Sequence, residues 1–197
     1  MDEVGRGPLA GPVVAAAVAF IPYAEPVRGV RDSKTLSGLQ RAELVPQIVE
    51  RALWLTVAAA SVREIDRLNI RRATALAMRR AVGRAVADPA FRQRALQAGA
   101  TSYRVFVDGL PMPECGFVHQ AIVDGDALCY SIAAAGIVAK EVRDRLMRQL
   151  AARYPGYGWE TNAGYATLQH CDALVARGPT PHHRRSFAPV AQLSFGL

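Results

Sequence analysis

The sequence predicts an α/β domain, with a mixed sheet flanked by helices in three layers. Two apolar runs in the first third of the chain have the length and composition of strands. Several later segments carry helix caps, so strands come first and then alternate with helices. With 51% hydrophobic and 21% charged residues, the 197-residue chain can bury the core of one large domain.

The first strand is expected at 13–20, an apolar run bounded by Gly-Pro and Pro. Ser37 with Gln40 resembles a capping box, in which each of the two side chains accepts a backbone N–H of the other residue. The box predicts a helix over 38–51. Pro46 is expected to kink this helix, because proline removes one helical hydrogen bond.

A second strand is expected at 53–60, directly before another capping box. Ser61 and Glu64 form this box, which predicts a helix over 62–87 with its apolar residues on one face. The arginine-rich segment near 88–100 is expected to be a surface elaboration.

The second half of the chain is predicted to hold one more strand and two helices. Residues 104–107 form a compact apolar strand that leads into Asp108. The strongest helical pattern covers 131–153, and a shorter helix near 167–177 is expected to end at Gly-Pro. The remaining residues are expected to be loop and tail.

The composition argues against several classes of protein. No apolar run reaches the roughly 18–20 residues that span a bilayer, and no segment resembles a signal peptide, so we expect no membrane association and a cytoplasmic location. Cys115, Cys129 and Cys171 are an odd number and form no CxxC pair, which argues against a disulfide framework or a structural zinc site.

The formal net charge of +7 favours a polyanionic partner. Charge of this kind raises the rate of encounter and supplies affinity that is independent of sequence and sensitive to salt. The alternative is that an arginine-rich composition makes the protein basic without a functional reason.

Four carboxylates have neighbours that are unusual for surface residues. Asp2 and Glu3 precede a glycine-rich turn, Asp108 follows an apolar strand, and Asp144 lies in the long predicted helix. Carboxylates that share a cleft raise each other's pKa and cost stability unless a divalent cation offsets their repulsion. Oxygen ligands select Mg²⁺ or Mn²⁺, and two such ions can catalyse phosphoryl transfer. The alternative is that each is an ordinary turn, cap or solvated helix residue.

The turn Gly5-Arg6-Gly7 also has two interpretations. It is either a plain turn or a segment whose glycines let the backbone approach a sugar-phosphate and offer it N–H groups.

Taken in order along the chain, these segments resemble ribonuclease HII, the type 2 ribonuclease H family. The resemblance covers nearly the whole chain, and its first motif, Asp-Glu-Val-Gly-Arg-Gly-Pro, is highly specific. The segments that carry it are 2–18, 32–37, 64–70, 73–78, 107–109, 140–147, 154–158 and 183–187.

The resemblance implies an RNase H-like fold, a mixed five-stranded sheet flanked by helices with a helical C-terminal region. It implies a catalytic domain over 1–153 and, over 154–197, a helical and loop extension that packs on it and binds substrate. By motif position, the resemblance implies that two Mg²⁺ or Mn²⁺ ions are held by Asp2, Glu3, Asp108 and Asp144.

The resemblance also implies roles for residues near the substrate. Gly5, Arg6 and Gly7 correspond to the loop that recognises the 2′-hydroxyl on the 5′ side of the cut. Tyr165 corresponds to the tyrosine that packs against the next sugar. The motifs near the substrate backbone contribute Lys34, Lys140, His183 and Arg184.

The activity implied is endonucleolytic hydrolysis of the phosphodiester 5′ of ribonucleotides, leaving 5′-phosphate and 3′-hydroxyl ends. The expected substrates are RNA/DNA hybrids and duplex DNA with single embedded ribonucleotides, and the enzyme is expected to be a monomer. The tail at 192–197 contains a Gln, a Leu and a Phe in an order that is reminiscent of sliding-clamp-binding peptides, although it is also interpretable as a plain terminus.

The chain departs from the family pattern at its start. Members have a hydrophobic strand before the Asp-Glu pair, whereas here Asp2 follows Met1 directly, and we hypothesise that Met1 is a misassigned start. That strand lies in the middle of the family's sheet, so its loss would leave neighbouring strands with unpaired backbone groups. Gly136 also stands where the family usually has serine.

Two other functions therefore stay open beside the nuclease. One is a catalytically impaired nucleic-acid-binding protein of the same fold, damaged by the missing strand. The other is a different metal-dependent phosphoryl-transfer enzyme on this fold, which the glycine turn and Tyr165 disfavour because they indicate ribonucleotide selectivity.

Overall fold

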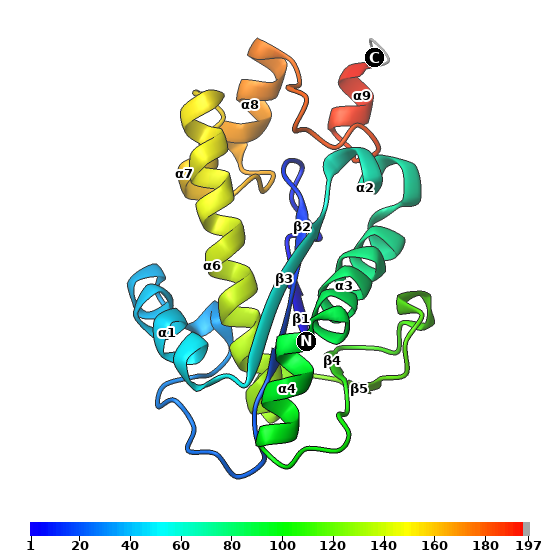
Figure 1. The fold of residues 1–197 in the computed structure, drawn as a ribbon. Helices are drawn as coiled ribbons and strands as arrows, with labels where there is room; N and C mark the ends of the chain where they lie inside the picture. The colour runs from blue at the N-terminus through cyan, green and yellow to red at the C-terminus, as the bar shows by residue number, and fades with distance from the viewer. Residues whose placement is uncertain (195–197) are drawn as a thin grey trace.

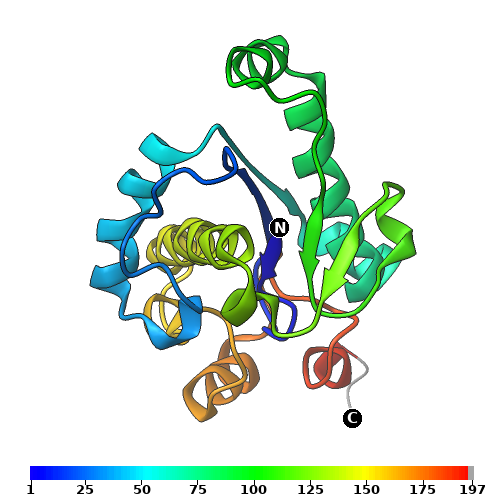
Figure 2. The same cartoon turned by 90° about the horizontal axis from the view of Figure 1, so that it is seen from below.

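The computed structural model describes the backbone of residues 1–194, and its strands form a layer between two groups of helices (Figures 1 and 2). The long helix α6 (Tyr130–Arg153) lies on one face, next to α1 (Gly38–Arg51). Helix α3 (Ile70–Ala87) packs on the other face. The predicted α/β architecture is confirmed.

The strands form two hydrogen-bonded groups. In the first group β1 pairs antiparallel with β2, and β2 pairs antiparallel with β3; in the second, β4 and β5 are parallel. The bounds are β1 (Asp2–Val4), β2 (Val13–Ala19), β3 (Trp54–Ala60), β4 (Phe106–Asp108) and β5 (Gln120–Ile122).

Met1 joins the two groups of strands. Its amino group donates a hydrogen bond to the Phe106 carbonyl at 2.7 Å, and its carbonyl accepts the Asp108 N–H at 3.2 Å. The five expected strands are therefore present in the order β3-β2-β1-β4-β5, but a single residue makes the central connection. The amino group is buried, and burial lowers its pKa to about 6.

The helices mostly follow the predicted pattern. Both capping boxes form, at Ser37 and at Ser61. The helix expected over 62–87 is wrong in one respect, because Asn69, with a positive φ of 68°, divides it and caps the second part. The other helices are α2 (Val62–Leu68), α4 (Pro89–Gln97), α5 (Gly125–Leu128), α7 (Trp159–Asn162), α8 (Leu168–Arg177) and α9 (Val190–Ser194).

Small side chains fill the space between the sheet and its two covering helices. On β2, Ala15 faces the cluster that includes alanines of α3, and the next residue, Ala16, faces the cluster that includes alanines of α6. Successive strand residues point to opposite faces, and alanine lets both helices approach the sheet closely. The Asp2 carboxylate of β1 is therefore held close to α6.

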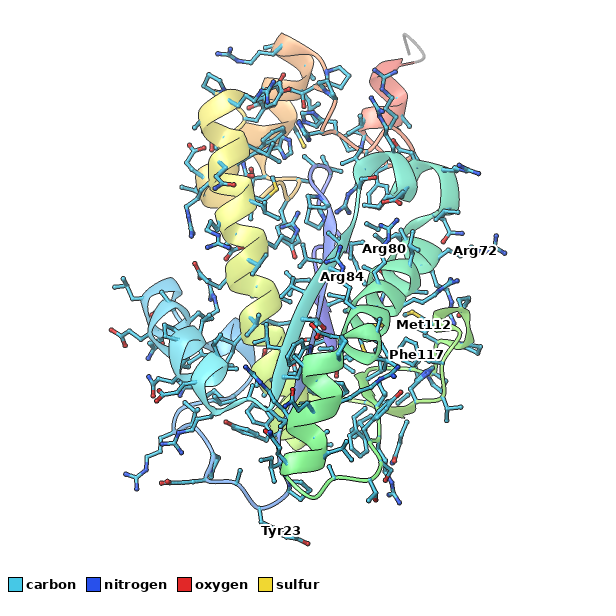
Figure 3. The ribbon with its side chains drawn as sticks, viewed as in Figure 1. Tyr23, Arg72, Arg80, Arg84, Met112 and Phe117 are labelled. Carbon is cyan, nitrogen blue, oxygen red and sulfur yellow. The ribbon has the colours of Figure 1, made fainter. Side chains whose placement is uncertain are left out.

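Two arginines of α3 cover the free side of β3, the last strand in the order (Figure 3). Arg84 donates a hydrogen bond to the Val57 carbonyl at 2.8 Å, and Arg80 donates one to the Ala59 carbonyl at 2.9 Å. Arg80 also forms an ion pair with Glu64 at 2.6 Å, which fixes its position. The outward carbonyls of Val57 and Ala59 are thus already paired.

A buried pair of histidines links the C-terminal segments. The Thr180 N–H donates to His183 Nδ1 at 2.9 Å, so the proton of His183 is on Nε2, which donates to His170 Nε2 at 3.0 Å. His170 Nδ1 then donates to the Tyr165 carbonyl at 2.8 Å, while Trp159 donates to His170 Nε2. Both rings are held neutral.

We predict that this histidine pair weakens the fold in acid. Burial and the neighbouring His170 lower the pKa of His183 to about 4, and burial lowers the pKa of His170. Because the unfolded chain binds these protons near pH 6.5 and the folded protein does not, stability is complete above about pH 6.5 and falls toward pH 4, by about 1–3 kcal/mol. Urea unfolding measured across this range tests the prediction.

Two histidine variants, one inside the pair and one outside it, test the cause of this pH dependence. His183→Gln is expected to give a shallower loss of stability between pH 6.5 and pH 4 than the parent protein. His119→Gln, which changes a histidine outside this cluster, is expected to keep the parent slope. Equal slopes in all three proteins would contradict the prediction.

Candidate active site

Three of the predicted carboxylates lie close to one another. Asp2 and Glu3 belong to β1, and Asp108 ends β4; since Met1 joins these two strands, their carboxylates share one region. Burial, Glu3 and Asp108 together raise the pKa of Asp2 to about 8. Burial and Asp108 also raise the pKa of Glu3, against the opposing effect of Arg6.

Glu3 has one oxygen that lacks a partner. Its Oε1 pairs with Arg6 at 3.4 Å, whereas Oε2 is buried and has no hydrogen-bond partner within the described part of the chain. A buried carboxylate oxygen without a partner is costly, and a bound cation would remove that cost.

The Asp2 carboxylate lies against α6 at Gly136. A Cβ atom at position 136 would collide with Asp2 Oδ2, and Ser33 is the next nearest side chain. Asp2 is only 7% exposed as a result. The glycine that departs from the expected serine therefore provides the space that Asp2 occupies.

The structure does not bring Asp144 to these three carboxylates. Asp144 lies eight residues beyond Gly136 on α6, which is about 12 Å along the helix axis. Its two oxygens are already paired, with Lys140 at 2.8 Å and with Arg41 at 3.1 Å. Lys140, expected near the substrate backbone, is thus paired with Asp144.

Asp126 is a further carboxylate close to Asp108, and it is absent from the site predicted from the sequence. The N–H of its neighbour Gly125 donates to Asp108 Oδ1 at 2.8 Å. Asp126 itself pairs with Lys34 at 3.3 Å, and Asp2 and Asp126 both act on the Lys34 ammonium. Asp126 lies in the short helix α5, four residues after the end of β5, and neither of these short elements has a clear signal in the sequence.

These residues fit a divalent cation. No three Asp, Glu, His or Cys side chains among the described residues converge closely enough to enclose one as they stand. However, burial and mutual repulsion raise the pKa values of Asp2 and Glu3, and one Glu3 oxygen has no partner, so a cation bound here would relieve both costs. An oxygen-only donor set of this kind suits Mg²⁺ or Mn²⁺.

The segment that joins β1 to β2, residues 5–12, is called the glycine loop below. Gly5 has a φ of 96°, and a Cβ there would collide with the Arg143 side chain, so both conformation and space require glycine. A Cβ at Gly7 would lie 3.6 Å from the Tyr165 ring. Tyr165 is 46% exposed and therefore flanks the outer side of this loop.

The other predicted substrate residues divide into exposed and buried groups. Lys34 is exposed and Lys140 is partly exposed. His183 and Arg184 are buried; His183 belongs to the histidine pair, and Arg184 donates to carbonyls of the glycine loop. The structure thus keeps these two side chains inside the protein.

The sequence profile of ribonuclease HII matches residues 1–190. A ribonuclease HII of Cereibacter sphaeroides is 50% identical over 197 residues, which is 99% of this chain and 85% of that protein. The chain belongs to the ribonuclease HII family. A Synechococcus ribonuclease HII is 49% identical over 198 residues, covering 100% of this chain and 83% of the relative.

Solved structures agree on the fold. The ribonuclease H2 of Pyrococcus horikoshii has a TM-score of 0.72 and 22% identity, covering 99% of this chain and 95% of that one. The Archaeoglobus fulgidus protein in a complex of PCNA and RNase HII has a TM-score of 0.65 and 22% identity, covering 98% and 94%. Family membership makes this ribonuclease HII homologue a ribonuclease H enzyme of the endonuclease class.

We predict that Asp2→Asn stabilises the metal-free protein. Because the pKa of Asp2 is about 8 in the folded state and about 4 in the unfolded state, the wild type loses stability as pH rises from about 4 to about 8. At pH 8 the variant is expected to be more stable by on the order of 1–3 kcal/mol, measured by urea unfolding with a chelator present.

Added Mn²⁺ is expected to stabilise the wild type more than Asp2→Asn, which a melting experiment measures as a larger rise in melting temperature. Asp172→Asn, a change to an exposed carboxylate on α8, serves as the control and is expected to behave like the wild type. A variant that is less stable than the wild type without metal would contradict the prediction.

Proposed function

We propose that this ribonuclease H cleaves the phosphodiester on the 5′ side of ribonucleotides, both in RNA/DNA hybrids and at single ribonucleotides in duplex DNA. The observation that carries the proposal is that the buried carboxylates of Asp2 and Glu3, directly before the glycine loop, lie close enough to Asp108 for the three to repel one another. Such a group is costly without a cation, and it stands beside backbone that can approach a sugar.

We propose that Asp2, Glu3 and Asp108 hold two divalent ions together with Asp126 rather than Asp144. Asp126 neighbours Asp108 through Gly125, whereas Asp144 is paired with two cationic side chains. When bound, Mg²⁺ or Mn²⁺ would activate a water for attack on phosphorus and neutralise the developing charge. The ends expected are 5′-phosphate and 3′-hydroxyl.

Selectivity for ribonucleotides is assigned to the glycine loop and Tyr165. The 2′-hydroxyl separates RNA from DNA at one position, and backbone groups of Gly5, Arg6 and Gly7 are placed to contact it. Tyr165 flanks the same surface and would pack against the adjacent sugar. Lys34, beside Asp126, would attract the phosphate backbone.

Several expectations about the surroundings of the enzyme stay predictions. In the Archaeoglobus complex the relative is found with PCNA, and a sliding clamp is the corresponding proposal here. The clamp-like tail includes residues 195–197, which lie outside the described residues. The domain division at 153/154 and a monomeric, cytoplasmic enzyme are likewise proposed. No helix in the described part of the chain is long and apolar enough to cross a membrane.

The test uses two duplexes of identical sequence, one with a single ribonucleotide and one all DNA, incubated with Mg²⁺ or Mn²⁺. Nicking only on the 5′ side of the ribonucleotide supports the proposal. Binding without nicking would support an impaired binding protein, and equal cutting of both duplexes would support a general nuclease.

We predict that Asp108→Asn abolishes cleavage while duplex binding changes little. The substitution removes a metal-binding charge but keeps the shape of the side chain and its acceptor for the Gly125 N–H. Cleavage of the ribonucleotide duplex and its dissociation constant are the two measurements. Near-native turnover in Asp108→Asn would remove this residue from the site.

A second pair of variants decides between the two candidates for the fourth carboxylate. Asp126→Asn is expected to lower the cleavage rate at least about tenfold, because it removes a metal-binding charge. Asp144→Asn is expected to stay within a few-fold of the wild type, apart from a lower melting temperature due to the loss of its ion pairs. The opposite order of rates would restore Asp144 to the site.

A further inference from the structure

Two buried arginines lie beneath the glycine loop, and their side-chain hydrogen bonds within the described residues go to carbonyls of this loop and of Ala163. Arg184 donates to the carbonyls of Gly5, Arg6 and Gly11, the last two at 2.8 and 2.9–3.0 Å. Arg143 donates to the carbonyls of Pro12 at 3.0 Å, Ala10 at 3.1 Å and Ala163 at 3.0 Å. Both side chains are 0% exposed.

Neither guanidinium forms an ion pair with a carboxylate within the described part of the chain. Asp66 acts on Arg184 and Asp144 acts on Arg143 only at longer range, and Arg184 also lies 5.1 Å from the centre of the Phe187 ring. Burial of a cation without a direct carboxylate partner costs stability. Burial and the neighbouring Arg143 lower the pKa of Arg184 to about 9, which is consistent with this cost. A function that needs the two cations at this place would explain why the cost is tolerated.

The direction of the carbonyls fixes the direction of the N–H groups. In a trans peptide the carbonyl and the N–H of the same plane point in opposite directions. Because the carbonyls of Gly5 and Arg6 point inward to Arg184, the N–H groups of Arg6 and Gly7 point away from it. Arg6 and Gly7 are exposed, so these N–H groups face the outside of the loop.

Arg143 connects the same loop to the Tyr165 segment. Its bond to the Ala163 carbonyl adds to the bond from the Leu9 N–H to the Gly164 carbonyl at 2.8 Å. The Tyr165 phenol lies close enough to act electrostatically on both guanidiniums. The two arginines thus hold both proposed sugar-contacting elements.

We infer that Arg143 and Arg184 are positioning residues, which turn the N–H groups of Arg6 and Gly7 outward and hold them in register with Tyr165. The inference rests on the proposed function, and it deepens it by naming what sets ribonucleotide selectivity. Lysine does not replace arginine at such a place, because one ammonium group cannot serve three carbonyls in the fixed planar geometry of a guanidinium.

The test measures binding preference rather than activity. Fluorescence anisotropy with a chelator present gives the dissociation constants of the single-ribonucleotide duplex and of the all-DNA duplex. The preference is the ratio of the two. Arg184→Lys and Arg143→Lys are each expected to lower this preference by about tenfold. Arg148→Lys, at an exposed position on α6, is the matched control and is expected to keep it.

Loss of folded protein does not imitate the expected result. A partly unfolded variant binds both duplexes less well by the same factor, so the ratio is unchanged. A wild type that prefers the ribonucleotide duplex, with both lysine variants within about twofold of that preference, would overturn the inference alone. A wild type without any preference would overturn the proposed function and the inference together.

Discussion

Two backbone hydrogen bonds of Met1 hold together the part of the molecule on which the site depends. They connect an antiparallel group of three strands to a parallel pair, and they bring the carboxylates of β1 next to Asp108 at the end of β4. β1 and β4 are each only three residues long. The alanine layers that pack α3 and α6 onto β2 therefore also hold β1 in position. The acidic group is therefore a product of strand order, and no short sequence segment contains it.

The charges of the site are arranged on two levels. Carboxylates of β1 and β4 repel each other, and burial together with this repulsion raises the pKa values of Asp2 and Glu3. Two guanidiniums lie deeper, on the inner side of the loop that follows β1. Under the proposed function, a nucleic acid bound here would contact metal ions at the carboxylates and the outward N–H groups at the loop. Its phosphate charge would be neutralised beside the place where its sugar is recognised.

Most long elements could be predicted from the sequence, because strands and helices of seven residues or more show clear runs and caps, as at Ser37 and Ser61. The sequence did not predict β5, α5 and α7, which have three or four residues each and show no period. It also did not predict α4, in which Phe91 is the buried residue, or the short helix α9, which falls where loop and tail were expected. The break at Asn69 depends on one positive φ. Three site carboxylates could be named from motifs. The place of Asp144 could not, because it depends on which turn of α6 lies against Asp2, and that turn is at Gly136. Likewise, nothing in the sequence distinguishes the buried Arg143 from Arg145 and Arg148, which are exposed on the same helix.

The arginines on β3 have a consequence for the behaviour of the protein in concentrated solution. An open strand normally offers its outward carbonyls to the N–H groups of another chain, which is how sheets of separate molecules fuse. At Val57 and Ala59 these acceptors are already used by Arg84 and Arg80, whose charges would also repel a second copy of the same edge. This edge of the sheet is thus protected against pairing with a second copy of the chain.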